Sequence, residues 1–126
     1  MTKKTTDNFI SITDVLEQKK LRKDYSSYHS EMFNKDFKID KIKPSTIVAI
    51  MNDSESDEYE KYAKLLYNSC SFFRSKELQR ECEAENPYDV VPEVFGDNYA
   101  EIFEFGNLIL EKYGFTGDRI ERVKKQ

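Results

Sequence analysis

Two long runs of apolar residues at helical spacing constrain the fold of this chain more than any other feature. In residues 59–73 and again in residues 99–113, apolar side chains recur every three or four positions, so each run lines one face of a helix. The two stripes consist of Tyr59, Tyr62, Ala63, Leu66, Cys70 and Phe73, and of Tyr99, Ile102, Phe103, Gly106, Ile109, Leu110 and Tyr113. We expect the two helices to pack against each other. Gly106 should mark their close approach, since a glycine otherwise weakens a helix by about 1 kcal/mol relative to alanine.

The N-terminal part of the chain predicts less regular structure. Residues 1–10 are polar and aperiodic, and we expect them to form a flexible tail. Ser11 and Asp14 fit a capping box that opens a short helix. The apolar residues of this helix are Ile12, Val15, Leu16 and Leu21. Residues 24–36 show neither helical nor strand spacing and are predicted to be loop, whereas residues 37–42 indicate one short, half-buried strand.

Proline and capping residues predict further short helices between and beyond the two stripes. The signals are Pro44 at the first turn of a helix over 44–52, Ser75 as the cap of a helix through Cys82, Asn86-Pro87 as the cap and first residue of an element that Pro92 keeps short, and a final stretch over 118–125.

Length and composition agree with one small domain. The chain has 126 residues and a mass of 14.9 kDa, which is the size of a single domain. Hydrophobic residues make up 38% and charged residues 35%, so a small core lies under a charged surface, and 13% aromatic residues distinguish the chain from disordered ones. We therefore predict a mainly α, small single-domain helical fold over residues 11–126, which can include one short N-terminal strand or hairpin.

No segment predicts a membrane span or an export signal. The longest apolar stretch, residues 47–51, is far shorter than the roughly 18 residues of a membrane-spanning helix. The N-terminal lysines are not followed by an apolar region, so we expect no secretory signal. Cys70 and Cys82 are separated by eleven residues, and we interpret them as free thiols of a reducing cytoplasm, with a disulfide as the alternative.

Charge is distributed unevenly along the chain. Residues 1–50 carry a net charge of +3, residues 51–106 a net charge of −9 and residues 107–126 a net charge of +2. An acidic middle segment and a pI near 5.1 should repel the phosphates of a nucleic acid, so we expect no nucleic-acid binding.

The residue types that carry most catalytic and metal chemistry are sparse. His29 has no nucleophile at a useful spacing beside it, and one histidine builds no histidine-rich metal site. Cys70 lies on an apolar stripe, and Cys82 has only Arg80 beside it to lower the pKa of its thiol. The acidic run 53–60 lacks the glycine and the closing glutamate of a calcium loop, and the four glycines form no phosphate loop. We predict no catalytic residue, no metal site and no cofactor, and hence no enzyme.

Aromatic residues outside the two stripes are the candidate binding residues. Phe72 adjoins the stripe residue Phe73 and should point elsewhere, and Phe105 and Tyr67 also lie off the stripes of their helices. Surplus aromatic residues are typical anchors of protein interfaces. The alternative is that a small domain wraps its core around both faces of a helix. Together with Tyr88, the predicted partner-binding set is Phe72, Phe105, Tyr88 and Tyr67.

Three segments occur in an order that is typical of one protein family. They are residues 66–78 (LYNSCSFFRSKEL), residues 86–91 (NPYDVV), and residues 104–110 (EFGNLIL) followed by Tyr113-Gly114. This order resembles the XkdN-like phage tail assembly chaperones over about residues 36–125, and the Pro-Tyr-Asp-Val-Val element is its most specific part. Residues 1–35 match nothing in that family. Because the family has no catalytic residues, the resemblance implies none in this chain.

The resemblance implies a function in virion assembly. Such chaperones act in the host bacterial cytoplasm and are absent from the finished virion. They bind the long tape-measure protein, keep it soluble and help tail-tube subunits polymerise around it. The implied partners are therefore the tape-measure protein and the tail-tube protein, with self-association as a further expectation. Related chaperones also give a longer frameshifted product, and Lys124-Lys125 fits a slippery A-rich codon run.

Two other classes of function stay open at this point. The acidic middle segment would suit a DNA-mimicking or otherwise inhibitory interaction protein of phage origin, although Lys61, Arg74 and other basic residues interrupt it. An enzyme that uses Cys82 or His29 would require a thiol of depressed pKa.

Overall fold

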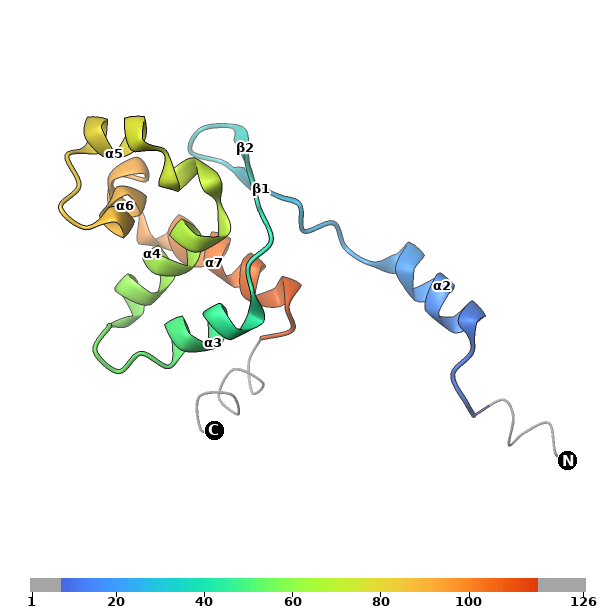
Figure 1. The fold of residues 1–126 in the computed structure, drawn as a ribbon. Helices are drawn as coiled ribbons and strands as arrows, with labels where there is room; N and C mark the ends of the chain where they lie inside the picture. Colours follow the sequence, from blue (N-terminus) through green and yellow to red (C-terminus); the bar gives the residue numbers. More distant parts are fainter. Residues whose placement is uncertain (1–7, 116–126) are drawn as a thin grey trace, which may run out of the picture.

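The computed structural model describes residues 8–115 and shows a mainly helical fold with one two-stranded hairpin, which confirms the predicted fold class (Figure 1). In chain order the elements are α2 (Ile12–Leu21), β1 (Ser27–Ser30), β2 (Lys35–Lys38), α3 (Pro44–Met51), α4 (Glu58–Ser69), the 3₁₀ helix η1 (Ser71–Arg74), α5 (Lys76–Cys82), the 3₁₀ helix η2 (Pro87–Asp89), α6 (Val90–Val94) and α7 (Tyr99–Lys112). Most of the predicted tail and all of the predicted helix over 118–125 lie outside the described residues.

Helices α4 and α7 form the centre of the fold and pack against each other, as their apolar stripes predict. Each begins at a side-chain cap: the carboxylate of Asp57 accepts a hydrogen bond from the backbone N–H of Glu60 at 2.9 Å, and the amide oxygen of Asn98 accepts one from Glu101 at 3.4 Å. Gly106 of α7 faces α4, where a β-carbon would overlap an aromatic ring. The predicted close approach at this glycine is therefore confirmed.

Helix α4 ends at Ser69 and not at Phe73, because Asp40 forms hydrogen bonds with backbone groups at the C-terminal end of the helix. The N–H of Asp40 donates to the carbonyl of Ser69 at 2.7 Å, and the carboxylate of Asp40 accepts from the N–H of Ser71 at 2.7 Å. Cys70 is consequently extended, and the chain continues as the 3₁₀ helix η1. Phe73 still reaches the core, but from η1.

The prediction of loop over residues 24–36 is wrong, because part of this segment pairs with the residues that follow it. Strands β1 and β2 are antiparallel, with Tyr28 opposite Phe37 and Ser30 opposite Lys35. Side chains of β1 alternate between the core and the surface, and the turn before β2 includes Asn34 in a left-handed conformation (φ 51°), which asparagine tolerates better than most residues. The predicted strand over 37–42 therefore starts two residues earlier and ends at Lys38.

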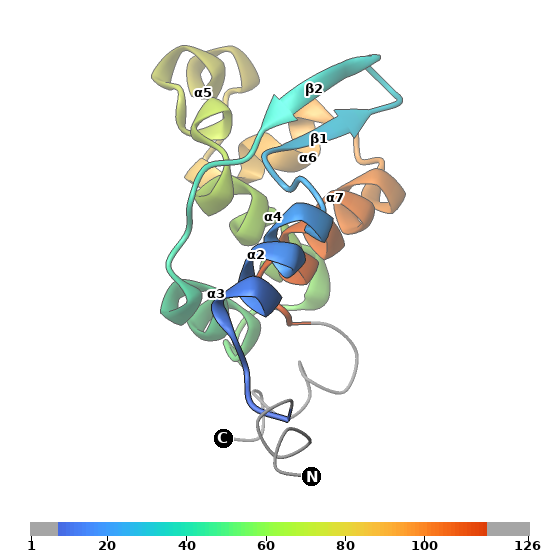
Figure 2. The same cartoon turned by 90° about the vertical axis from the view of Figure 1, so that its right-hand side faces the viewer.

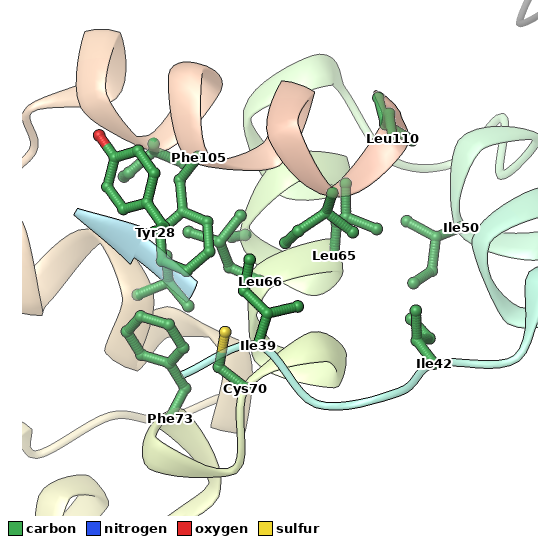
Figure 3. Packing of buried hydrophobic residues seen from close by; sticks show 14 of the residues in the cluster. Tyr28, Ile39, Ile42, Ile50, Leu65, Leu66, Cys70, Phe73, Phe105 and Leu110 are labelled. Carbon is green, nitrogen blue, oxygen red and sulfur yellow. The ribbon is translucent and has the colours of Figure 1, made fainter. Parts of the chain in front are cut away.

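The hydrophobic core lies between the hairpin and helices α3, α4, α6 and α7. Figure 3 shows side chains of α4 and α7 facing each other, with Tyr28 of the hairpin stacked on Phe105 of α7. The largest fully buried side chains are Phe73, Phe95, Phe105, Ile47, Leu65, Leu66, Ile102, Ile109 and Leu110. Ile39 and Ile42, just past β2, close the core toward α3.

Helix α2 stands apart from this body in Figure 1, and in the turned view of Figure 2 it lies in front of it. Its capping box is formed as predicted: Ser11 Oγ accepts from the N–H of Asp14 at 3.2 Å, and the Asp14 carboxylate accepts from the N–H of Ser11 at 2.9 Å. None of its residues is buried, however. Its apolar side chains are thus left without a partner in the described part of the chain.

Candidate functional site

The candidate site is an apolar groove between β2, η1, α5 and α6, with a volume of about 590 Å³. Its apolar lining consists of Phe33, Phe37, Phe72, Leu78, Cys82 and Val94. The charged residues Lys35, Asp36 and Lys38 of β2 also line the groove. An open hollow with mostly apolar walls and charged edges is the usual form of a peptide-binding groove.

Phe37 forms the link between this groove and the core. Its ring is stacked on Phe73 with centroids 5.5 Å apart, and it also contacts Phe95 at 5.4 Å and Phe105 at 5.6 Å. Phe33 meets the ring of Phe37 edge-on at 6.0 Å. Because buried rings hold Phe37 on several sides, the wall that it provides is fixed before any ligand binds.

Phe72 is the most exposed aromatic side chain of the groove, with 49% of its surface accessible. The early end of α4 and the turn of η1 send Phe73 fully into the core and leave its neighbour outside. The Phe72 ring contacts Phe37 and Phe73 edge-on, each at 5.5 Å. The prediction that Phe72 points away from the core is therefore confirmed.

Helix α5 provides the opposite wall through Leu78 and Cys82. Ser75 caps it as predicted, with Oγ accepting from the N–H of Leu78 at 3.3 Å. Burial, together with the nearby carboxylates of Glu93 and Glu81, raises the pKa of the Cys82 thiol above its ordinary value. The thiol therefore stays protonated at neutral pH and serves as an apolar surface.

The structure corrects the position of one predicted binding residue and separates the others. The expectation that Phe105 is a spare surface aromatic is wrong, because its side chain is fully buried beneath Tyr28. Tyr67 is half-buried and its hydroxyl accepts from Gln79 Nε2 at 3.5 Å. Tyr88 is half-buried, lies in a second hollow beside α4 and has Lys64 Nζ 5.0 Å from its ring centroid. Of the four predicted residues only Phe72 lines the groove.

The other groove residues were not predicted, because residues 24–36 were expected to be loop and the position of the hairpin that carries Phe33 and Phe37 was therefore unknown. The available signal was Phe33 and Phe37 on either side of Asn34, a residue suited to a left-handed turn. Leu78 and Val94 belong to helices too short to show an apolar stripe. The groove combines short elements that are distant in sequence, so only the folded chain defines it.

Acidic residues are concentrated in the α5–α6 segment beside the groove. Residues 76–97 contain seven acidic and two basic side chains. Glu81 and Glu93 are exposed, and their carboxylates lie near enough to raise the pKa of the Cys82 thiol. A ligand that is apolar on one face and basic beside it would match the apolar lining and the glutamates beside α5 and α6.

A buried polar cluster lies on the other side of the hairpin. Glu101 of α7 is only 7% exposed and accepts hydrogen bonds from Ser30 Oγ at 2.5 Å and from the Tyr28 hydroxyl at 3.4 Å. Burial and the Glu101 carboxylate raise the pKa of Tyr28. This cluster fastens β1 to α7, so we assign it a structural role.

Other features of the described residues add little to the candidate site. His29 Nδ1 lies 2.8 Å from the Asp36 carboxylate on the exposed face of the hairpin. Within residues 8–115 no three potential metal-ligating side chains gather at one point, and no helix has both the length and the apolar character needed to cross a membrane. Comparisons of the chain with known protein families, with curated proteins and with solved structures give no match.

Proposed function

We propose that this protein is a phage or prophage tail assembly chaperone that binds an apolar helical segment of the tape-measure protein in the groove beside Phe72, without enzymatic activity. The observation that carries the proposal is the exposed Phe72 ring at the edge of a preformed apolar groove. The sequence resemblance in residues 66–78, 86–91 and 104–114 supports it, because the first segment contains η1 and the beginning of α5, which form part of the groove.

The chemistry of the groove suits one face of an amphipathic helix. Such a helix presents apolar side chains at positions i, i+3, i+4 and i+7 to an apolar groove. Each large apolar side chain that becomes fully buried contributes roughly 1.5–3 kcal/mol, so two or three anchors suffice for a specific but reversible contact. Basic residues beside the apolar face would meet the exposed glutamates of α5 and α6.

In this role the protein acts in the host bacterial cytoplasm and does not remain in the mature virion. Covering the apolar faces of a long helical partner prevents those faces from aggregating before assembly. Tail-tube subunits, the second proposed partner, would replace the chaperone as they polymerise around the tape measure. A reversible contact is required for this replacement, which is consistent with the small area of a single groove.

The proposal is tested by co-expression with the tape-measure protein, encoded by the next long downstream gene, followed by affinity recovery of the tagged chaperone. Phe72→Ala should lose the soluble complex. Tyr59→Ala is the matched control, since Tyr59 is 52% exposed and touches two aromatic rings, as Phe72 does, but lies outside the groove. Equal recovery with both variants, or no complex with the unmodified chain, would contradict the proposal.

A further inference from the structure

The described chain contains two apolar surfaces that lack a partner: the groove and one face of α2. We propose that α2 of one copy docks into the groove of a second copy, so that the protein self-associates through its N-terminal helix until another partner displaces it. This inference rests on the proposed function in one respect, namely that the groove is the same helix-binding site.

Helix α2 has the pattern that the groove requires. Ile12, Val15 and Leu16 follow the spacing i, i+3, i+4 and therefore share one face of the helix. Their side chains are 80%, 44% and 52% exposed, respectively. An isolated helix of ten residues is marginal in water, so contact with an apolar surface would stabilise α2 itself.

The charges of the two surfaces are complementary. Residues 11–23 contain four basic and two acidic side chains, and the basic ones all lie in the last turn of α2 or just after it. Residues 76–97, which include the groove residues Leu78, Cys82 and Val94, contain seven acidic and two basic side chains, and the carboxylates of Glu81 and Glu93 lie near the Cys82 thiol. The basic end of α2 would thus lie beside Glu81 and Glu93, whose carboxylates act on Cys82 at the α5–α6 wall of the groove.

The course of the connecting segment favours a second copy over the same copy. Figure 1 shows α2 and α5 on opposite sides of the hairpin. Lys23, just after α2, lies 3.7 Å from the Glu111 carboxylate of α7, and the carbonyl of Ser26 accepts from the N–H of Ile39 at 2.9 Å. These contacts direct α2 away from its own groove. Docking into a neighbouring copy leaves them in place, and a reciprocal exchange between two copies makes the same contact twice.

Engineered cysteine pairing tests the geometry in the full chain. Cys82 lies in the groove and Cys70 is fully buried, so Val15→Cys adds one thiol on the apolar face of α2. Mild oxidation should give a covalent dimer in which peptide mapping finds position 15 joined to position 82. Glu17→Cys, on the opposite face of α2, should give much less of this product, and Val15→Cys with Cys82→Ser should give none.

Two results of this experiment would overturn the inference. A disulfide between positions 15 and 82 within one monomer would mean that α2 docks in its own groove. Equal yields from Val15→Cys and Glu17→Cys would mean that the chains meet without specific docking.

Light scattering after size-exclusion chromatography provides an independent measurement. The unmodified chain should show a mass that rises with concentration, and Leu16→Glu should remain monomeric and recover more of the tape-measure protein than the unmodified chain. Loss of self-association in the Phe72→Ala variant is also expected. A monomeric unmodified chain that still binds the tape measure through Phe72 overturns self-docking and leaves the proposed function intact. A disulfide between positions 15 and 82 of two chains, without any tape-measure complex, would support self-docking and overturn the proposed function.

Discussion

The aromatic ring of Tyr62 occupies the space in which a side chain at position 106 would lie. A β-carbon placed on Gly106 would overlap the ring and lie 2.8 Å from its Cε2 atom. The ring cannot move away easily, because its hydroxyl donates to Asn107 Oδ1 at 2.7 Å and the ring forms a T-shaped contact with Phe103, with centroids 4.9 Å apart. This contact sets the distance between α4 and α7 at the centre of the fold.

We predict that Gly106→Ala lowers the free energy of unfolding by about 1–3 kcal/mol, as overpacking does in other cores. The sign of this change is informative. Alanine is the better helix former by about 1 kcal/mol, so the substitution would stabilise the protein if nothing occupied the space beside position 106. Urea denaturation monitored by circular dichroism measures the change. In a Tyr62→Ala background the same substitution should be neutral or stabilising, and an equal loss in both backgrounds would rule out the ring contact as its cause.

The second prediction concerns the attachment of the hairpin to α7. Glu101→Ala removes the acceptor shared by Ser30 and Tyr28 and leaves buried hydroxyl groups without their partner. We expect a loss of about 1–3 kcal/mol in the free energy of unfolding. Glu104→Ala is the control, since Glu104 is exposed on the same helix. Similar unfolding curves for the two variants would show that the buried hydrogen bonds contribute nothing.

Local signals in the sequence predicted most helices and their starts. Ser11 with Asp14, Ser75, and Pro44 all occupy the capping or first-turn positions that their chemistry predicts. These predictions hold because a cap depends on residues three or four positions away. The hairpin depends instead on Glu101, which lies more than seventy residues from Ser30 in the chain. No local pattern indicates such a partner.

The wrong prediction for Phe105 follows from the prediction of loop over residues 24–36, where strand β1 lies. Position 105 lies off the stripe that faces α4, so the sequence predicted a spare aromatic at the surface. The hairpin covers that second face of α7, and Tyr28 stacks on the Phe105 ring with centroids 4.3 Å apart. The alternative weighed from the sequence, a core wrapped around both faces of a helix, is the correct one for this residue.

The third prediction concerns the reactivity of the two thiols. Burial raises the pKa of Cys70 to about 12, with Asp40 adding to the shift, and burial and nearby carboxylates also raise the pKa of the half-buried Cys82. Because the thiolate is the reactive form, a thiol reagent at pH 8 should modify Cys82 slowly and Cys70 not at all in the native protein. The Cys82 rate should keep rising as the pH increases from 7 to 9, since deprotonation is far from complete in that range.

Counting labelled thiols by mass spectrometry checks this prediction. One label per chain is expected in the native protein and two in urea, and Cys82→Ser should carry none until it is unfolded. Rapid native labelling of Cys70 would show that the core around it opens more readily than its complete burial indicates.

The last prediction distinguishes a core residue, Phe73, from its neighbour in the groove, Phe72. Phe73 is fully buried and contacts Phe37, Phe95 and Phe105, so Phe73→Ala should lower the free energy of unfolding by about 3–5 kcal/mol. Phe72 is half-exposed on the same turn of η1, and Phe72→Ala should cost about 1 kcal/mol or less. Thermal and urea denaturation of both variants provide the comparison. A large loss in the free energy of unfolding for Phe72→Ala would show that the Phe72 ring belongs to the structural core. In that case the loss of a complex by this variant would reflect unfolding and would not identify Phe72 as a binding residue.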